Sequence, residues 1–301
     1  MTTYTKPLTA GQAAQLRVLL TAQGFEFEPK PYCLYAGSRP GVNVLVYEKG
    51  PKVVVQGKGT EDFVTMTLEP QVLGVAEIGY EEVHHPERFA PHIGVDESGK
   101  GDYFGPLVIA GVFVDGTIAR HLQSVGVMDS KRISSDARIE VLARAIRSTP
   151  GIAYEVIAIG PERYNEMHAS FGNLNRLLAW GHARVIENLL AKRPDCPQAI
   201  SDQFANPTVL QRALGERGKA IELVQRTKAE SDPAVAAASI LARERFVVWL
   251  RETGAKLGTE LPKGASAAVI HAAKTLVKAH GEGVLPSVAK LHFRTSQAVA
   301  E

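Results

Sequence analysis

Two adjacent carboxylates, Asp96 and Glu97, end an apolar run and lead directly into a Gly-Lys-Gly turn. Neighbouring carboxylates repel each other, so keeping both in one place favours a compensating cation. Gly99 and Gly101 permit unusual backbone angles and a close approach to a ligand, and Lys100 between them is able to meet a phosphate. The exposed amides of such a turn are able to read a sugar hydroxyl. The acid pair alone, however, is also typical of a solvated turn after a strand.

Three further acids stand where ligands gather in α/β proteins. Asp202 follows a second apolar run, and the carboxyl end of a strand is a common place for a ligand. Glu230 and Asp232 precede an Ala-rich helix, whose small face permits close packing on a sheet. Asp232 stands before Pro233 and suits a helix N-cap, whereas no cap is needed at Glu230. Both acids remain candidates for one role beside the other carboxylates.

Carboxylates from different elements form an oxygen-only set of ligands. Such a set suits Mg²⁺ or Mn²⁺, whereas zinc prefers His or Cys. Two such ions about 4 Å apart activate a water and stabilise the departing oxygen of a phosphodiester. The sequence has no His/Cys cluster, Ser-His-Asp arrangement or Walker loop that offers a rival chemistry. The residues therefore indicate a metal-dependent phosphodiester hydrolase without an organic cofactor.

The elements that must position these acids alternate along the second part of the chain. Strands are predicted at residues 93–96, 107–114, 152–159, 198–201 and 220–225, and helices at residues 135–148, 173–192 and 233–252. This alternation predicts an α/β fold in which helices flank a mixed sheet.

The first part of the chain has a different pattern. Thr9 and Gln12 have the spacing of a capping box at a helix start. Strand-like runs and a short helix follow, at residues 32–35, 42–47, 53–55 and 60–68. We therefore expect a small α+β domain over residues 1–85, a linker over residues 86–91 and the catalytic domain over residues 92–301.

The composition is that of an ordinary globular protein, with 45% hydrophobic and 22% charged residues. A net charge of +2 is compatible with a nucleic-acid substrate but does not argue for one. Cys33 and Cys196 form no CxxC motif, and we expect both to be reduced core residues. We see no signal peptide and no membrane span, so a cytoplasmic monomer that contacts no membrane is expected.

Several motifs together resemble the type 2 ribonucleases H. The segments that carry this resemblance are residues 96–108 (DESGKGDYFGPLV), 129–132 (DSKR) and 235–243 (VAAASILAR). Further segments resemble the HIII branch of this family, at residues 102–106, 173–190, 201–204, 261–266 and 289–295. The resemblance extends from about residue 91 to the C-terminus. The preceding α+β unit is similar in layout to the TBP-like domain of the HIII enzymes.

The resemblance implies an RNase H-like catalytic domain that hydrolyses the RNA strand of an RNA/DNA hybrid duplex. The products carry 5′-phosphate and 3′-hydroxyl ends, and two Mg²⁺ or Mn²⁺ ions are expected when substrate is bound. The family's metal-binding acids correspond to Asp96, Glu97, Asp202 and a fourth acid. The family's spacing favours Glu230 for the fourth, and Asp232 stays open because the segment is one residue short of the HII pattern.

The resemblance also implies roles for individual residues. Asp96 would hold both ions, and Glu97 would hold one of them and sense the 2′-hydroxyl. The predicted substrate contacts are the backbone at Ser98, Gly99, Lys100 and Gly101 for the ribose, Ser130, Lys131 and Arg132 for phosphates, and Lys49, Lys52 and Lys58 of the first domain for the duplex. Without the family, the lysines and Arg132 fit solvated surface positions equally well.

Two alternatives remain at this stage. The first is an HII-like enzyme that nicks duplex DNA on the 5′ side of a single ribonucleotide. The second is a hybrid-binding protein that has lost catalysis, which the full set of acids argues against.

Overall fold

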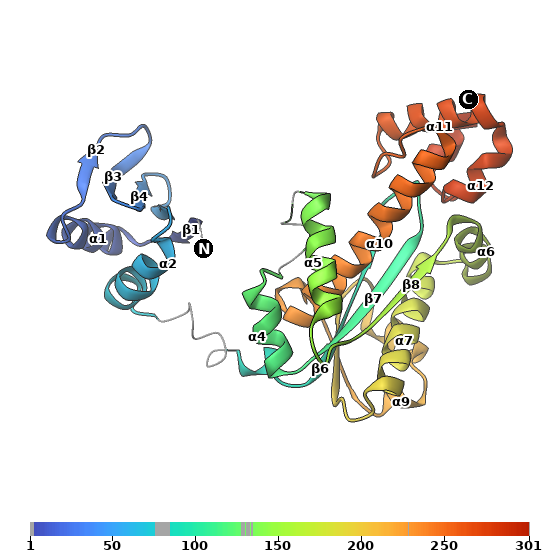
Figure 1. Ribbon diagram of the computed structural model, residues 1–301, viewed down its shortest axis with the longest axis horizontal. Helices are drawn as coiled ribbons and strands as arrows, with labels where there is room; N and C mark the ends of the chain where they lie inside the picture. Colours follow the sequence, from blue (N-terminus) through green and yellow to red (C-terminus); the bar gives the residue numbers. More distant parts are fainter. Residues whose placement is uncertain are drawn as a thin grey trace. The chain divides into compact units, whose positions relative to one another are not determined.

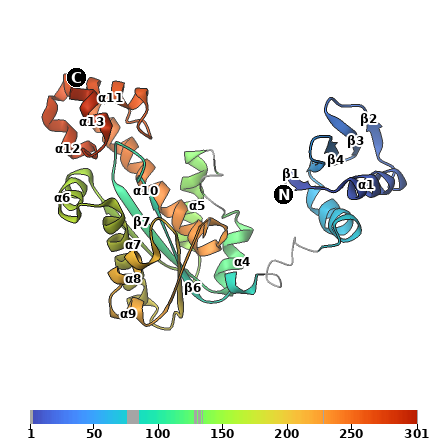
Figure 2. The ribbon, with the colours of Figure 1, turned by 180° about the vertical axis from the view of Figure 1, so that it is seen from behind.

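The computed structural model describes residues 3–75, 85–127, 130, 133, 135–227 and 229–300. The chain divides into two compact units, Met1–Glu87 and Arg88–Glu301 (Figures 1 and 2). Each unit has its own sheet and its own hydrophobic core. Among the described residues, no helix is both long and apolar enough to cross a membrane.

The N-terminal unit is a five-stranded antiparallel sheet with helices on one face, which confirms the α+β prediction. Its elements are β1 (Thr3–Pro7), α1 (Ala10–Ala22), β2 (Glu26–Glu28), β3 (Cys33–Arg39), β4 (Val42–Tyr47), β5 (Lys52–Gln56), α2 (Thr60–Phe63) and the π-helix η1 (Val64–Leu73). The strand order is β1-β5-β4-β3-β2.

Local sequence explains most of this unit. The capping box is present, because Thr9 N donates to Gln12 Oε1 at 2.9 Å and Gln12 N donates to Thr9 Oγ1 at 3.2 Å. Alternate residues of β4 and β5 are buried under the helices, and their neighbours face the other way. The short helix expected at residues 60–68 instead widens and continues to Leu73. Pro70 lies inside the wide turns and lacks the N–H that α-helical bonding requires there.

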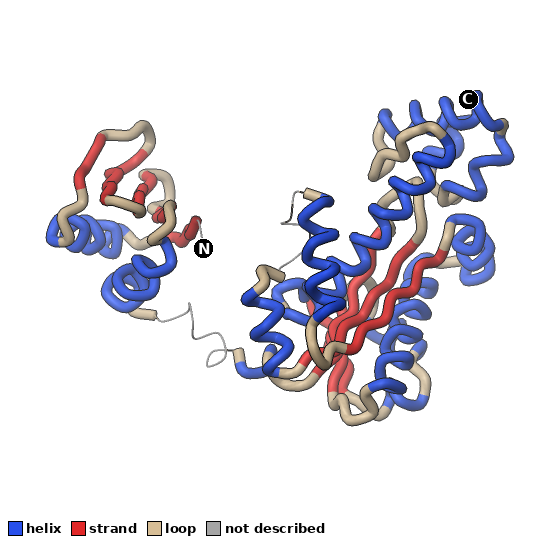
Figure 3. The backbone as a smooth tube through the Cα atoms, viewed as in Figure 1, coloured by secondary structure: helices blue, strands red, loops and turns tan. Residues whose placement is uncertain are grey.

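The C-terminal unit, which the sequence resemblance identifies as the catalytic unit, is built on the predicted mixed sheet, and its strands are red in Figure 3. The strand order is β10-β9-β6-β7-β8. Its strands are β6 (His92–Ser98), β7 (Leu107–Val114), β8 (Ala153–Ile159), β9 (Gln198–Asp202) and β10 (Glu222–Arg226). Its longer helices are α4 (Gly116–Ser124), α5 (Asp136–Ser148), α6 (Pro161–Phe171), α7 (Leu174–Lys192) and α10 (Pro233–Leu257). β9 runs parallel to β6 and β10, whereas β7 is antiparallel to β6 and β8.

Helices α10 and α7 pack on opposite faces of this sheet. A Cβ atom added at Gly94 of β6 would lie 2.2 Å from the backbone nitrogen of Val235, so only glycine lets α10 approach this closely. On β7, a Cβ atom at Gly111 would lie 2.4 Å from Val185 of α7. The Ala-rich start of α10 is buried as expected. Both faces of the sheet are therefore covered, and strand ends are left as the places where chemistry is possible.

The structure adds elements that the sequence patterns did not predict. α10 continues five residues beyond the predicted end. Three C-terminal helices follow it, α11 (Ala267–His280), α12 (Leu285–Val288) and α13 (Arg294–Ala300). The shorter helices α8 (Pro207–Ala213) and α9 (Glu216–Lys219) were also not expected. Cys196 is buried as predicted, but Cys33 is only partly buried because it lies at the start of β3; both thiols are free.

Candidate active site

Asp96 and Glu97 occupy consecutive positions of β6, so their side chains leave opposite faces of the strand. Asp96 turns toward α10, where Ser239 hydrogen-bonds to it. Glu97 turns toward α7, where its Oε2 lies 3.1 Å from His182 Nε2. The alternation of the strand thus gives the two acids different surroundings within one strand end.

Asp96 carries an unfavourable charge in these surroundings. Burial and the neighbouring charge of Glu97 raise the pKa of Asp96 to about 7, although Ser239 and the backbone amide of Glu97 oppose the shift. That amide donates to Asp96 Oδ1 at 2.8 Å. A nearby cation stabilises the charged form of a carboxyl group whose pKa is raised by burial.

Glu97 is held in its charged form by the protein itself. Burial acts to raise its pKa, but the hydrogen bond with His182 and the charge of Lys100 outweigh burial, and the pKa of Glu97 is lowered. Lys100 Nζ lies 3.4 Å from Glu97 Oε1. The predicted partner for a phosphate therefore pairs with an acid in this structure.

His182 is a site residue that the sequence reading missed. It is completely buried in α7, and its Nδ1 lies 3.0 Å from Ser201 Oγ while its Nε2 faces Glu97. The ring therefore joins β6 to β9 beneath the acids. A polar residue inside the apolar face of a long helix was the signal that could have revealed it, since buried polar groups need partners.

Asp202 ends β9, which lies beside β6 in parallel register, with Val95 opposite Ser201. Its Oδ1 accepts a hydrogen bond from Ala229 N at 3.2 Å. Ala229 begins the 3-10 turn Ala229–Ser231, which carries Glu230. The sheet register and this single bond bring Asp202 and the turn of Glu230 to the strand end that holds Asp96.

Asp232 has a different environment from Glu230. It is the N-cap of α10, is fully buried, and its Oδ1 accepts from Ala234 N at 2.9 Å and Val235 N at 3.1 Å. The same oxygen lies 3.0 Å from His92 Nε2. The capping interpretation of Asp232 is therefore observed, whereas Glu230 is partly exposed on its turn.

A cleft of about 370 Å³ opens over the acids and the Gly-Lys-Gly turn. The residues that line it are Asp96, Glu97, Ser98, Gly99, Lys100, Gly101, Asp102, Ser130, Asp202, Ser239 and Arg243. Gly99 has a φ of +87°, and a Cβ atom there would lie 2.2 Å from Pro106 O, so the turn requires glycine. Gly101 is exposed with open space beside it. The turn thus presents backbone to the cleft, as expected for a ligand contact.

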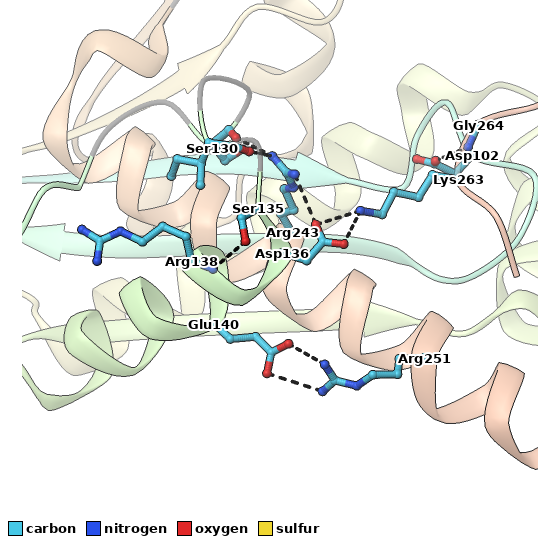
Figure 4. Close-up of polar contacts among 11 residues, drawn as sticks. Asp102, Ser130, Ser135, Asp136, Arg138, Glu140, Arg243, Arg251, Lys263 and Gly264 are labelled. Atoms are coloured by element: carbon cyan, nitrogen blue, oxygen red, sulfur yellow. Dashed lines mark hydrogen bonds and ion pairs between the residues drawn. The ribbon is translucent and has the colours of Figure 1, made fainter. Parts of the chain in front are cut away.

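Ser130 borders the cleft but is buried, with its Oγ 2.7 Å from Ser239 Oγ. Arg243 of α10 donates to the carbonyl oxygens of Ser130 and Ile133, the latter at 3.0 Å. Figure 4 shows Arg243 reaching from α10 to Ser130. Arg243 was also missed by the sequence reading. The predicted phosphate contacts Lys131 and Arg132 lie outside the described residues.

A second set of charges continues from Arg243 along the rim (Figure 4). Asp136, at the start of α5, lies 3.3 Å from Arg243 and 2.6 Å from Lys263 Nζ. Burial acts to raise the pKa of Asp136, but the bonds from Lys263 and Arg243 outweigh it and lower the pKa. On the same two helices, Arg251 pairs with Glu140 at 2.5 Å. These pairs fix α5 to α10 beside the cleft.

The chemistry of the donor set fits a hard divalent cation. Asp96, Glu97 and Asp202 offer only oxygen, and the raised pKa of Asp96 marks a place where positive charge is favoured. In the part of the chain that the structure describes, no three His, Cys, Asp or Glu side chains already converge as metal ligands. The physical reason is that each carboxylate is turned to a donor of the protein: Ser239, His182 or Ala229 N.

Known proteins are similar to this chain in both sequence and fold. The family described as Ribonuclease HII matches residues 93–296. A ribonuclease HIII of Protochlamydia amoebophila (strain UWE25) is 42% identical over 280 residues, which cover 93% of this chain and 91% of the relative. A ribonuclease HIII of Chlamydia muridarum (strain MoPn / Nigg) is 43% identical over 296 residues, with 98% and 96% covered.

Solved structures give the same result. The crystal structure of Bst-RNase HIII in complex with Mn²⁺ has a TM-score of 0.69 and 30% identity, and the match covers 99% of this chain and 98% of that one. The crystal structure of Aquifex aeolicus RNase H3 has a TM-score of 0.56 and 29% identity, with 97% and 100% covered. The chain belongs to the ribonuclease HIII family and is an enzyme of the ribonuclease H class.

Proposed function

We propose that this enzyme hydrolyses the RNA strand of RNA/DNA hybrids with the help of two divalent cations, Mg²⁺ or Mn²⁺, and leaves 5′-phosphate and 3′-hydroxyl ends. The observation that carries the proposal is the acid pair on β6, in which Asp96 has its pKa raised to about 7 beside a Gly-Lys-Gly turn. The related Bst-RNase HIII was crystallised in complex with Mn²⁺, which supports a divalent cation as the cofactor of this enzyme.

Asp96, Glu97, Asp202 and Glu230 are the residues that we expect to hold the cations. Cations bound there supply Lewis-acid activation of a water and charge stabilisation of the departing oxygen. Three of these acids already lie on the adjacent parallel strands β6 and β9, and Ala229 N ties the turn of Glu230 to Asp202. We therefore expect these side chains to reorient when the cations bind.

Glu230 is the better candidate for the fourth ligand. Asp232 Oδ1 already serves two amides at the start of α10 and faces the ring of His92. Burial acts to lower the pKa of His92, but the hydrogen bond and charge of Asp232 outweigh it and raise the pKa. A carboxylate with these partners stabilises a helix start, and withdrawing it would leave them buried without a partner.

The turn from Ser98 to Gly101 is the part that we expect to distinguish RNA from DNA. Its backbone faces the cleft beside Glu97, and a ribose 2′-hydroxyl both donates and accepts hydrogen bonds. Amides at Gly99 and Gly101 are suited to the hydroxyl oxygen, and Glu97 is suited to its proton. The deoxyribose of a DNA strand would leave these groups without their partner.

The N-terminal unit is the part that we expect to add affinity for the duplex. The face of its sheet opposite the helices carries Asn43, Leu45, Val54 and Gln56, which are exposed or half-buried and lie side by side in the register. A shallow face of polar and small apolar groups suits a groove of a nucleic acid. Positive charge for the phosphates is available at three exposed side chains, Lys49, Lys52 and Lys58.

A second activity, nicking on the 5′ side of one ribonucleotide within duplex DNA, is favoured by one observation. The family that matches residues 93–296 is described as Ribonuclease HII, not HIII. A duplex with one embedded ribonucleotide tests this second activity. We expect slow cleavage of it relative to a continuous hybrid, and efficient cleavage would favour the second activity.

The primary test compares three duplexes, RNA/DNA, DNA/DNA and RNA/RNA, with Mg²⁺ and separately with Mn²⁺. We expect cleavage of the RNA strand of the hybrid alone, and end-labelled products should show 5′-phosphates. Glu230→Gln and Asp232→Asn, run side by side, test the fourth ligand. Glu230→Gln should lose cleavage while keeping its stability, and Asp232→Asn should lower the melting temperature more than the activity of the folded enzyme. The reverse pattern would reassign the ligand to Asp232.

A further inference from the structure

The Gly-Lys-Gly turn is continued by a loop, residues 99–105, that is bonded to a distant segment of the chain. Tyr103 N donates to Gly264 O at 2.9 Å, and Lys290 N donates to Tyr103 O at 2.8 Å. Gly105 N donates to Val288 O at 2.9 Å. Segments more than 150 residues away in the sequence therefore fix the backbone of the loop.

Side chains strengthen this connection from both directions. Asp102 Oδ1 accepts a hydrogen bond from Gly264 N at 2.6 Å, a contact drawn in Figure 4. In the other direction, Lys290 Nζ donates to the carbonyl oxygens of Asp102 at 2.9 Å and Gly105 at 2.6 Å, with Phe104 O at 3.4 Å. The amino group of Lys290 thus donates hydrogen bonds to three carbonyl groups of the same loop.

Lys290 is completely buried, which is unusual for a lysine. Burial lowers the pKa of Lys290 to about 7, and the charge of Asp102 opposes the shift. The rings of Tyr164 and Phe246 lie 5.6 and 6.0 Å from the amino group. Because a buried polar group is costly unless hydrogen-bonded, the three carbonyl groups are what makes this position tolerable.

The loop itself does not enforce its shape. Gly99 and Gly105 both have positive φ angles, +87° and +86°, and glycine adopts many other conformations freely. Tyr103 and Phe104 are fully buried and anchor the second half of the loop, whereas Gly101 in its first half is exposed. The geometry of the exposed amides therefore depends on bonds that hold the carbonyl groups of the loop inward.

We propose that Lys290 is a positioning residue that holds the loop of residues 99–105 in the shape required to read a ribose. The inference rests on the proposed function for the reading step, but the clamp on the loop is a property of the protein alone. Lys290 does not reach the acids and acts on the reaction only through the loop. Through Lys290, the segment that follows α12 would take part in substrate recognition.

The test uses the full-length chain with Lys290→Met, Lys290→Gln and Leu276→Ala. Leu276 is buried in α11 and takes no part in the bonds described above, so its variant controls for general loss of stability. Hydrogen–deuterium exchange is measured on peptides that cover residues 99–105, well below each melting temperature. The ratio kcat/KM is measured on an RNA/DNA hybrid under the same conditions.

We expect Lys290→Met to speed exchange of the loop amides about tenfold and to lower kcat/KM by about tenfold or more, since a misplaced contact group is costly for a reaction. Lys290→Gln keeps two N–H donors and should lie between Met and the native residue. Leu276→Ala should leave both quantities unchanged. Unchanged loop exchange in Lys290→Met, or an equal effect in Leu276→Ala, would overturn the clamp.

The remaining outcomes separate this inference from the proposed function. If the native enzyme does not cleave the hybrid, the proposed function fails, and loop exchange alone still decides whether Lys290 holds the loop. If exchange becomes faster in Lys290→Met while kcat/KM stays unchanged, the clamp exists but does not position a group that recognises substrate, and the inference is overturned.

Discussion

The helices cover the two sheets of this protein to different extents. In the catalytic unit, α10 and α7 pack on opposite faces of the sheet, and the cleft opens at the strand end of β6. In the N-terminal unit, the helices cover one face, and the side chains on the other face of β4 and β5 are exposed or half-buried. The first arrangement offers a cleft at a strand end, whereas the second offers the face of a sheet.

The charged groups differ in the same way. The acids of the cleft are partly buried and their pKa values are displaced, upward for Asp96 by burial and downward for Glu97, where His182 outweighs burial. Lys49, Lys52 and Lys58 of the N-terminal unit are exposed. Displaced pKa values accompany chemistry, and exposed charges give affinity that depends on salt. We therefore infer that the catalytic unit determines kcat and that the N-terminal unit acts on KM.

The largest expected effect is the loss of cleavage in Asp96→Asn. The amide is close in size but carries no charge for a cation, and a bound cation contributes several kcal/mol to such a reaction. We expect kcat for a hybrid to fall by about 1,000-fold or more. Circular dichroism and a melting curve should show a folded protein that is no less stable, because the repulsion from Glu97 is removed. A near-native kcat in this variant would contradict the inference that the acids of the catalytic unit determine kcat.

A smaller effect is expected for His182→Phe. Phenylalanine fills the space between α7 and the sheet but removes the hydrogen bonds to Glu97 and Ser201. Partners behind a metal ligand are typically worth about 10- to 100-fold in metal affinity or activity. Calorimetric titration with Mn²⁺ and kcat on a hybrid measure the two quantities. His182→Asn, which retains a donor, should recover part of the loss. Equal values in both variants would indicate that the ring acts only as packing.

A triple alanine variant of Lys49, Lys52 and Lys58 tests the other half of the comparison. We expect KM for a hybrid to rise about tenfold at moderate salt while kcat stays within about twofold, because phosphate contacts contribute binding and not chemistry. The dependence of binding on salt concentration should become weaker.

The control for this variant removes three exposed lysines of the catalytic unit far along the chain, Lys256, Lys274 and Lys278. The net charge changes by the same amount in both variants. An equal rise in KM for the control would attribute the effect to overall charge and not to the N-terminal unit.

The smallest effect is expected for Asp136→Asn at the rim of the cleft. Folding lowers the pKa of Asp136, so its ionised form stabilises the fold at pH values above its ordinary pKa. This contribution is lost as the pH falls through the lowered value. We expect the variant to be less stable by under about 1 kcal/mol at pH 7. Melting curves should show the difference shrinking below pH 4, and a difference that grows there would contradict the assigned ion pairs.

Much of the fold could be predicted from local pattern. The strand at Leu107–Val114 and the N-caps Ser135 and Asn173 follow from apolar runs and side chains that suit helix starts. The C-terminal helices could not be placed in the same way. Their bonds to the loop at Tyr103 and Gly105 join residues more than 150 positions apart, and no local pattern encodes such a contact.

The site shows the same division. The residues that we propose carry the chemistry, such as Asp96 and Asp202, could be recognised because they are acids at the ends of apolar strands. The residues that support them were harder to recognise, because the local sequence does not show which groups they contact. His182 gives only the signal of a polar residue on an apolar helix face, and Arg243 lies in the family-like segment 235–243 without any sign of its partners. The contacts of His182 with β6 and β9, and of Arg243 with Ser130, form only in the folded protein, so the sequence alone does not reveal them.

Single-turnover cleavage of an RNA/DNA hybrid across a range of Mn²⁺ concentrations tests the central claim most directly. For the native enzyme, we expect no cleavage without the metal and a rate that rises to saturation as Mn²⁺ is added. For Asp96→Asn, we expect a rate that stays near the background at every concentration. A native rate independent of Mn²⁺, or equal rates for the two proteins, would contradict a metal-dependent site at the end of β6.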